Sequence, residues 1–137
     1  MNTIGQEIMA YNLITPQDVA SAAETSTTVY VSMAGAKSGC IIITAHLTAS
    51  KTADCQLTCA SDTAGTGKED VSGKTVSLGD STGGEYVDKI DFDVHDLDLD
   101  DSKYFVGVDV TTNQSGDDIA ATLITARLDY AYGDDMF

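Results

Sequence analysis

The chain has 137 residues, of which 42% are hydrophobic. This length fits one domain that buries roughly two thirds of the unfolded chain's surface. Acidic residues outnumber basic ones by 22 to 7, and the resulting net charge of −15 argues against binding to nucleic acid and to anionic membranes. The acidity itself fits a solvated surface, cation binding or docking onto a basic partner.

The first 26 residues are predicted to form an extended N-terminal arm that leads into the domain. Apolar residues between positions 1 and 14 have no regular spacing, which fits a short helix and an extended arm equally well. Thr15 and Pro16 are typical of a helix N-terminus, although the residues that follow support no more than about one turn. This end of the chain lacks the features of a signal peptide, and no apolar run is long enough for a membrane-spanning helix.

The next hundred residues show the patterns of short strands. Strands are predicted over residues 27–33, 40–48 and 53–61, with a weaker edge strand over 71–78. The segment 40–48 is apolar on both faces at its start, which predicts a strand covered on both sides at the centre of the fold. His46 lies on this strand, where a hydrogen-bonded structural histidine is expected more often than a ligand.

The acidic stretch 85–109 predicts two strands that are neighbours in one antiparallel sheet. Apolar and polar residues alternate up to Val94, and the phase then slips at His95. A bulge or bend at this point would return Leu97 and Leu99 to the core. The second strand covers 103–111 and places four residues on one face, namely Tyr104, Val106, Val108 and Val110.

The end of the chain predicts a polar hairpin loop and a last strand. The loop 112–118 would join the strand 103–111 to a strand over 119–132, which is again apolar on both faces at its start. The even-numbered residues from 120 to 132 form the more apolar set. Residues 133–137 are an acidic tail. The whole pattern predicts an all-β fold, a single antiparallel β-sandwich or jelly-roll-like domain over 1–137 with about seven or eight short strands.

The three cysteines, Cys40, Cys55 and Cys59, cannot all pair within one chain. Cys55 and Cys59 would share one face of a strand at a separation of roughly 13 Å, which is beyond disulfide reach. Buried free thiols are the favoured interpretation, and a bridge from Cys40 to one of the others or to another subunit is the alternative. Neither His46 nor His95 has a Cys-x-x-Cys partner, so zinc is disfavoured.

No motif in the sequence indicates catalysis or a cofactor. The run from Asp96 matches the first ligand positions of a calcium loop, but Asp101 stands where Gly is needed and Gly107 where Glu is needed. Alternating carboxylates sharing one cation are a minor alternative to a solvated acidic face. The Gly-rich stretch 62–68 lacks phosphate-loop spacing, and no G-x-S-x-G elbow is present. We therefore predict a protein that is not an enzyme and has no cofactor.

The order of four segments resembles a known group of proteins. These segments are DVASAAETSTTVYVSMAG, CIIITAHLT, DCQLTCASD and LDLDDSKYFVGVDVTTNQSGDDIAATLITARLDYA. They resemble small β-sandwich structural proteins of tailed bacteriophages, which decorate or cement capsids. The likeness spans roughly residues 18–132. It consists of the order and general residue pattern of these segments and not of an invariant motif, so it transfers no functional residue. It implies a virion protein, assembled in the host cytoplasm, that contacts the major capsid protein and copies of itself in a capsid, tail or fibre.

Surplus apolar residues near the two ends are the predicted interface, because terminal arms can reach neighbouring subunits. Packing of these residues on their own domain is the alternative. The second function considered is a calcium-assisted adhesion or carbohydrate-binding module, against which the absence of Trp counts. The predicted interface residues are Ile4, Ile8, Met9, Tyr11, Tyr130, Tyr132, Met136 and Phe137.

Overall fold

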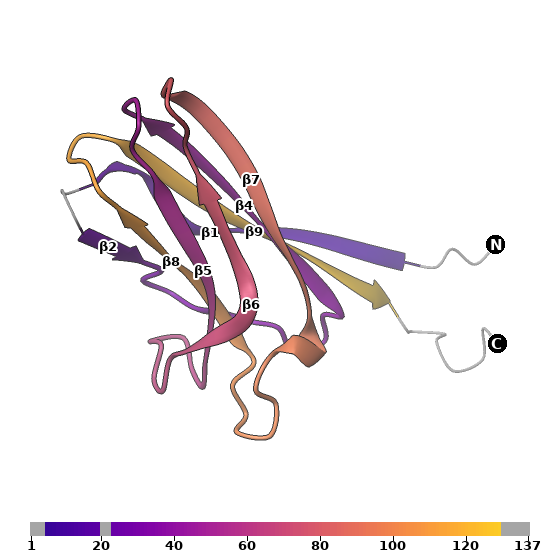
Figure 1. Cartoon of the computed structure of the whole chain (residues 1–137). Coiled ribbons are helices and arrows are strands. Elements are labelled where there is room, and N and C mark those ends of the chain that lie inside the picture. The colour runs from indigo at the N-terminus through magenta and orange to yellow at the C-terminus, as the bar shows by residue number, and fades with distance from the viewer. Residues whose placement is uncertain (1–4, 20–22, 130–137) are drawn as a thin grey trace.

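The computed structural model describes residues 5–19 and 23–129, and these residues form two antiparallel sheets packed face to face (Figure 1). A 3-10 turn, η1 (Val94–Asp96), follows β7. The nine strands of the described residues are β1 (Gly5–Asp18), β2 (Ala23–Ser26), β3 (Val31–Ser32), β4 (Ser38–Leu47), β5 (Ala53–Ala60), β6 (Glu69–Leu78), β7 (Gly84–Asp93), β8 (Phe105–Thr112) and β9 (Asp118–Asp129).

The strand order is that of a jelly roll. One sheet has the order β1-β9-β4-β7 and the other β2-β8-β5-β6, with β3 also paired to β8. If β2 and β3 are counted as one interrupted strand, the first strand pairs with the last, the second with the second-last, and so on inward to β5 and β6. The chain is therefore one long hairpin folded across two sheets, which gives the double Greek key of this fold. The predicted fold class is confirmed.

Alternating side chains of both sheets form the core. Ile41 and Ile43 of β4 face the other sheet with no exposed surface, and Leu57 of β5 is equally buried. The period of two places their neighbours on the opposite surface of each sheet. From the second sheet and β9, the fully buried residues include Val106, Val108, Val110 and Leu123.

The connection after β7 differs from the prediction. β7 and β8 belong to different sheets, because η1 and the turn after it carry the chain across the sandwich. Asp93 caps η1 by accepting from the amide of His95 at 2.9 Å, while the Asp96 carboxylate accepts from the amide of Asp93 at 2.8 Å. This bend returns Leu97 to the core at 6% exposure, but Leu99 stays 41% exposed.

The loop 112–118 is also not a hairpin, since it joins β8 of one sheet to β9 of the other. Asp117 anchors it by accepting from the backbone amide and the hydroxyl of Thr48 at 3.1 and 2.8 Å. A polar Gly-containing loop has the same composition whether it turns back within a sheet or crosses to the other one, so sequence alone does not separate the two.

The predicted arm contains a strand of the sheet. Residues 5–18 form β1, which pairs with β9 along its length, so Thr15 and Pro16 lie in a strand and not in a helical turn or an entry loop. The register of β1 shifts after Asn12 and again after Ile14, and the consecutive residues Leu13 and Ile14 are both buried. This irregularity hides the strand from a search for alternating residues.

The predicted strand 27–33 is mostly a loop, and only Val31 and Ser32 pair with β8. Tyr30 folds over the outer surface of the second sheet, where its hydroxyl lies 3.2 Å from the Thr58 hydroxyl. Gly107 lies beneath the ring, and a Cβ at that position would stand 2.7 Å from it. The loop thus covers part of the outer face of the second sheet.

We predict that Ile41→Ala lowers the free energy of unfolding by about 2–5 kcal/mol, because it empties a fully buried site. Ile42→Ala is the matched control on the same strand. It removes a partly exposed side chain and should cost about 1 kcal/mol or less. Chemical denaturation of both variants measures the difference. Equal losses would contradict the assignment of the two faces of β4.

Candidate functional site

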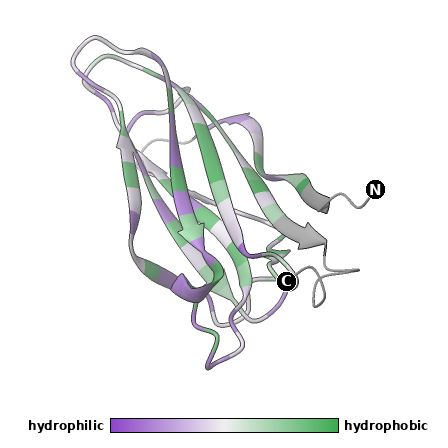
Figure 2. Ribbon diagram, turned by 90° about the vertical axis from the view of Figure 1, so that its right-hand side faces the viewer, coloured by the Kyte–Doolittle hydropathy of each residue, from purple (hydrophilic) through white to green (hydrophobic). Residues whose placement is uncertain are grey.

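The outer surface of the sheet β1-β9-β4-β7 is apolar along its middle strands. On β9 the buried set is odd-numbered, from Ile119 to Thr125, so Ala120, Thr122, Ile124 and Ala126, the even-numbered residues whose exposure the structure describes, face outward. Figure 2 shows hydrophobic residues recurring along the strands. We define the outer apolar face as Ile8, Ala10, Cys40, Ile42, Ala120, Ile124 and Ala126, all partly or largely exposed.

Strand register brings these residues together. Ile8 lies opposite Ala126 and Ala10 opposite Ile124 across β1 and β9, and Cys40 lies opposite Ile124 across β4 and β9. Ile8 is 67% exposed, which is high for a large aliphatic side chain. The surface is therefore continuous across three strands.

The outer apolar face is hollowed at one end. A depression of about 340 Å³ lies between Ile8, Cys40, Asp91 and Ile124. Its floor is shaped by Gly39, where a Cβ would stand only 2.5 Å from the ring of Phe92. A glycine here lets the phenyl ring pack directly against the core side of β4.

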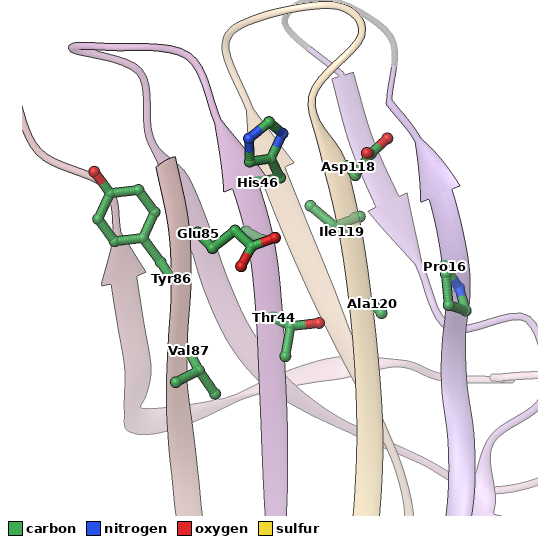
Figure 3. Close-up of a pocket in the computed structure, with 10 residues that line it drawn as sticks. Pro16, Thr44, His46, Glu85, Tyr86, Val87, Asp118, Ile119 and Ala120 are labelled. Atoms are coloured by element: carbon green, nitrogen blue, oxygen red, sulfur yellow. The ribbon is translucent and has the colours of Figure 1, made fainter. Parts of the chain in front are cut away.

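A larger groove lies at the other end of the same sheet, with a volume of about 600 Å³ (Figure 3). His46 of β4 lies between Glu85 of β7 and Asp118 of β9 in the strand register. Tyr86 and Pro16 also line the groove. The structure thus places His46 on the exposed outer face.

Charged side chains frame this groove. A hydrogen bond with Asp18, partial desolvation and the like charge of Asp18 raise the pKa of the Asp118 carboxyl above its ordinary value of 3.8. In the adjoining loop, the hydroxyl and amide of Thr82, the Tyr86 hydroxyl and the amide of Gly83 all donate to Asp80 and lower its pKa. The hydrogen bond to Asp80 raises the pKa of Tyr86. The loop beside the groove is held in one arrangement by a single carboxylate.

The three cysteines are free, as the favoured interpretation expected. Burial raises the pKa of the Cys55 thiol to about 12 and also raises that of Cys59. Burial, together with a hydrogen bond to Asp91, raises the pKa of Cys40 on the outer apolar face. All three are held as thiols, which are poor nucleophiles and poor metal ligands.

Lys103, which follows the acidic run after η1, pairs with Glu69 of β6. Lys103 donates to Glu69 at 2.9 Å, and a hydrogen bond with Glu69 lowers the pKa of Asp98. Within residues 5–19 and 23–129, no group of three or more His, Cys, Asp or Glu side chains is arranged to hold a metal ion. The same part of the chain contains no helix long and apolar enough to cross a membrane.

The structure describes three of the eight predicted interface residues. Ile8 and Met9 are 67% and 38% exposed, and Tyr11 is half-buried against the core. The predicted set leaves out Ile42 and Ile124 of the outer apolar face, although both lie in the two segments that are apolar on both faces. The other predicted residues lie outside the described residues, namely Ile4, Tyr130, Tyr132, Met136 and Phe137.

Comparison with known proteins supports the fold alone. No known protein family and no curated protein matches the sequence. A chain in a structure of infectious bursal disease virus, Gx strain, is 6% identical with a TM-score of 0.52, over 89% of this chain and 32% of that chain. This chain therefore spans about a third of that viral chain's length.

Two further solved structures score lower. A chain from empty particles of cowpea mosaic virus, its top component, has a TM-score of 0.43 at 8% identity, over 96% of this chain and 85% of that one. A family 11 carbohydrate-binding module from Clostridium thermocellum, solved with a mixed-linked tetrasaccharide, has a TM-score of 0.36 at 13% identity, over 89% and 87%. Both scores are too low to support an argument about this chain.

We predict that Asp118→Asn stabilises the protein at neutral pH. The raised pKa means that the folded state disfavours the ionised carboxyl, so stability is lower above its ordinary pKa and rises as pH falls through the folded-state pKa. The variant should therefore melt higher than wild type at pH 7, and the gap should close in acid.

Asp91→Asn is the control with the opposite sign. A hydrogen bond from Lys89 lowers the pKa of Asp91, and the two side chains lie 3.0 Å apart. The stability that this ion pair supplies is present above the ordinary pKa and lost as pH falls, so the variant should melt lower at pH 7. Melting curves at several pH values test both variants. If both changed the melting temperature at pH 7 in the same direction, the opposite pKa shifts of Asp118 and Asp91 would be contradicted.

We also predict an order of thiol reactivity. In the folded protein at mildly alkaline pH, a thiol reagent should label Cys40 slowly and leave Cys55 and Cys59 unmodified, because burial suppresses their thiolates. All three should react after denaturation. Mass spectrometry counts the labelled cysteines. Fast labelling of Cys55 in the folded protein would contradict its placement in the core.

Proposed function

We propose that this protein is a non-enzymatic structural component of a virion, which decorates or cements a bacteriophage capsid. Its contacts would be with the major capsid protein and with copies of itself. The observation that carries the proposal is the outer apolar face, which three strands of the first sheet present without a cover from the described chain. Jelly-roll sandwiches serve as capsid and lectin domains, so the fold is compatible with this role without proving it.

The apolar face has the makeup of a docking surface. Ile42 and Ile124 lie at its centre, while the charged residues Lys89, Asp91 and Asp118 lie at its margin. An apolar centre with a polar rim is the usual organisation of a protein interface. Burying partly exposed aliphatic groups also releases water without requiring this acidic chain to neutralise carboxylates.

The opposite face of the sandwich is suited to water. Glu24, Asp54 and Asp70 line a polar depression of about 420 Å³ on the second sheet. Lys68 crosses this surface to pair with Asp109 at 2.8 Å. One sheet thus offers apolar contact and the other a solvated acidic surface, so the protein would sit on a shell with its acidic face outward.

One observation favours the second candidate, a carbohydrate-binding module. The groove of about 600 Å³ combines the ring of Tyr86 with the polar groups of His46, Glu85 and Asp118. A single aromatic ring offers a small stacking surface for a sugar. Of the two candidates, the structural role therefore has the more extensive support.

Co-sedimentation with purified empty phage shells tests the proposal. The wild-type protein should pellet with a matched shell, and Ile42→Glu and Ile124→Glu should lose at least about tenfold in affinity, because each buries an unpaired carboxylate. Thr111→Glu is the control, since it adds the same charge to an exposed site on the other sheet. It should pellet like wild type.

Two results would contradict the proposal. One is failure to bind any shell together with a rise in melting temperature in the presence of β-glucan oligosaccharides, which would favour the carbohydrate-binding candidate. The other is equal loss of shell binding in all three variants, because added charge alone would then explain the effect.

A further inference from the structure

We propose that two copies of this chain join edge to edge through β1, so that their first sheets form one continuous sheet. Within the part of the chain that the structure describes, β1 pairs with β9 on one side and with no strand on the other. Its open edge therefore presents unpaired backbone amides and carbonyls, which is the template for addition of another strand.

The four sheet edges differ in how their charges are distributed. Residues 8–14 of β1, with the sequence IMAYNLI, contain no charged side chain, and β1 carries carboxylates only near its ends, at Glu7 and Asp18. The other long edges carry carboxylates along the whole of β7 and at the start of β6, where they repel a second acidic chain. These carboxylates are Glu85, Asp88, Asp91 and Asp93 on β7, and Glu69 and Asp70 on β6.

The remaining edge is short and broken, because β2 has four residues and β3 has two. β2 also carries Glu24. Neither strand offers a run of backbone comparable with the 14 residues of β1. Length and charge together single out β1.

Charge also identifies the partner as a second copy. A basic partner would be drawn to the acidic edges and the acidic face, whereas the neutral stretch 8–14 gives it no electrostatic advantage. A chain with a net charge of −15 can approach its own copy closely only where carboxylates are missing. A two-fold axis beside β1 makes each edge complementary to the other, since each copy supplies the same donors and acceptors.

The pairing would also extend the outer apolar face. In an antiparallel pair related by a two-fold axis perpendicular to the sheet, each residue and its copy point to the same side of the sheet. Ile8 and Ala10 of both copies would therefore lie on the same surface, and the two apolar faces would become one. Two linked copies would hold a shell more firmly than one, because the second contact becomes intramolecular.

This inference rests on the proposed structural role, whose contact between copies it specifies. The test is light scattering coupled to size exclusion over a range of concentrations, with amide hydrogen exchange on the same samples. The wild-type protein should form dimers, and amides within residues 8–14 should exchange more slowly as the dimer fraction rises.

Two matched variants separate the effect of a change at the β1 edge from the effect of added charge alone. Ile8→Glu on β1 should raise the dimer dissociation constant by at least about tenfold, because it places a carboxylate in the contact. Val87→Glu should leave the constant unchanged, since Val87 is 68% exposed against 67% for Ile8 and lies on the opposite edge of the same sheet. Ile124→Glu, at the centre of the outer apolar face, should also leave the dimer intact.

A monomer at every soluble concentration would overturn the inference, and so would dimers that Val87→Glu disrupts as much as Ile8→Glu. Unchanged exchange of residues 8–14 in a dimer would overturn it as well. The two proposals fail separately: a monomer that still binds shells rejects only the β1 contact, whereas a β1 dimer that ignores every shell rejects only the virion role.

Discussion

The pairing of β4 with both β9 and β7 is the constraint on which the rest of the structure depends. β4 lies between these strands in register over most of its length, and its inward residues Ile41 and Ile43 are fully buried. These contacts are far apart in the sequence, so the sandwich closes only when the ends of the long hairpin meet. The same pairing fixes which residues of three strands face outward, and it thereby assembles the outer apolar face.

The two outer surfaces of the sandwich differ in how far the described chain covers them. The loop 27–30 covers part of the second sheet, where Tyr30 packs above Gly107 and Thr58, and the surrounding surface is acidic. In the first sheet the apolar pattern continues to the outside without such a cover. The outer apolar face thus stays uncovered by the described chain, while Glu24, Asp54 and Asp70 make the surface of the second sheet acidic.

The sequence predicted the fold class well because most strands alternate regularly, as in residues 85–94 and 103–111. It predicted connections poorly, because η1 and the loop 112–118 have the same polar composition as hairpin turns. It missed β1 as a strand, since the buried pair Leu13 and Ile14 breaks the alternation.

For the candidate site, the sequence showed which segments are apolar on both faces, but it did not show what covers their outer residues. Segments 40–48 and 119–132 were predicted to be covered on both sides at their start. Among the described residues, Cys40, Ile42, Ala120, Ile124 and Ala126 on the outer side are apolar, whereas Thr44, His46 and Thr122 are polar. The expected cover is not supplied by the described chain, and a period of two cannot tell burial within a domain from burial between molecules. Only the register of β9 shows which of its two sets faces outward.

Electron cryo-microscopy of shells mixed with the protein would test the central claim most directly. The account predicts added density on the shell, in which the sheet β1-β9-β4-β7 faces the shell and the acidic sheet faces solvent. Density that places the acidic sheet against the shell, or shells that stay bare at saturating protein, would contradict it.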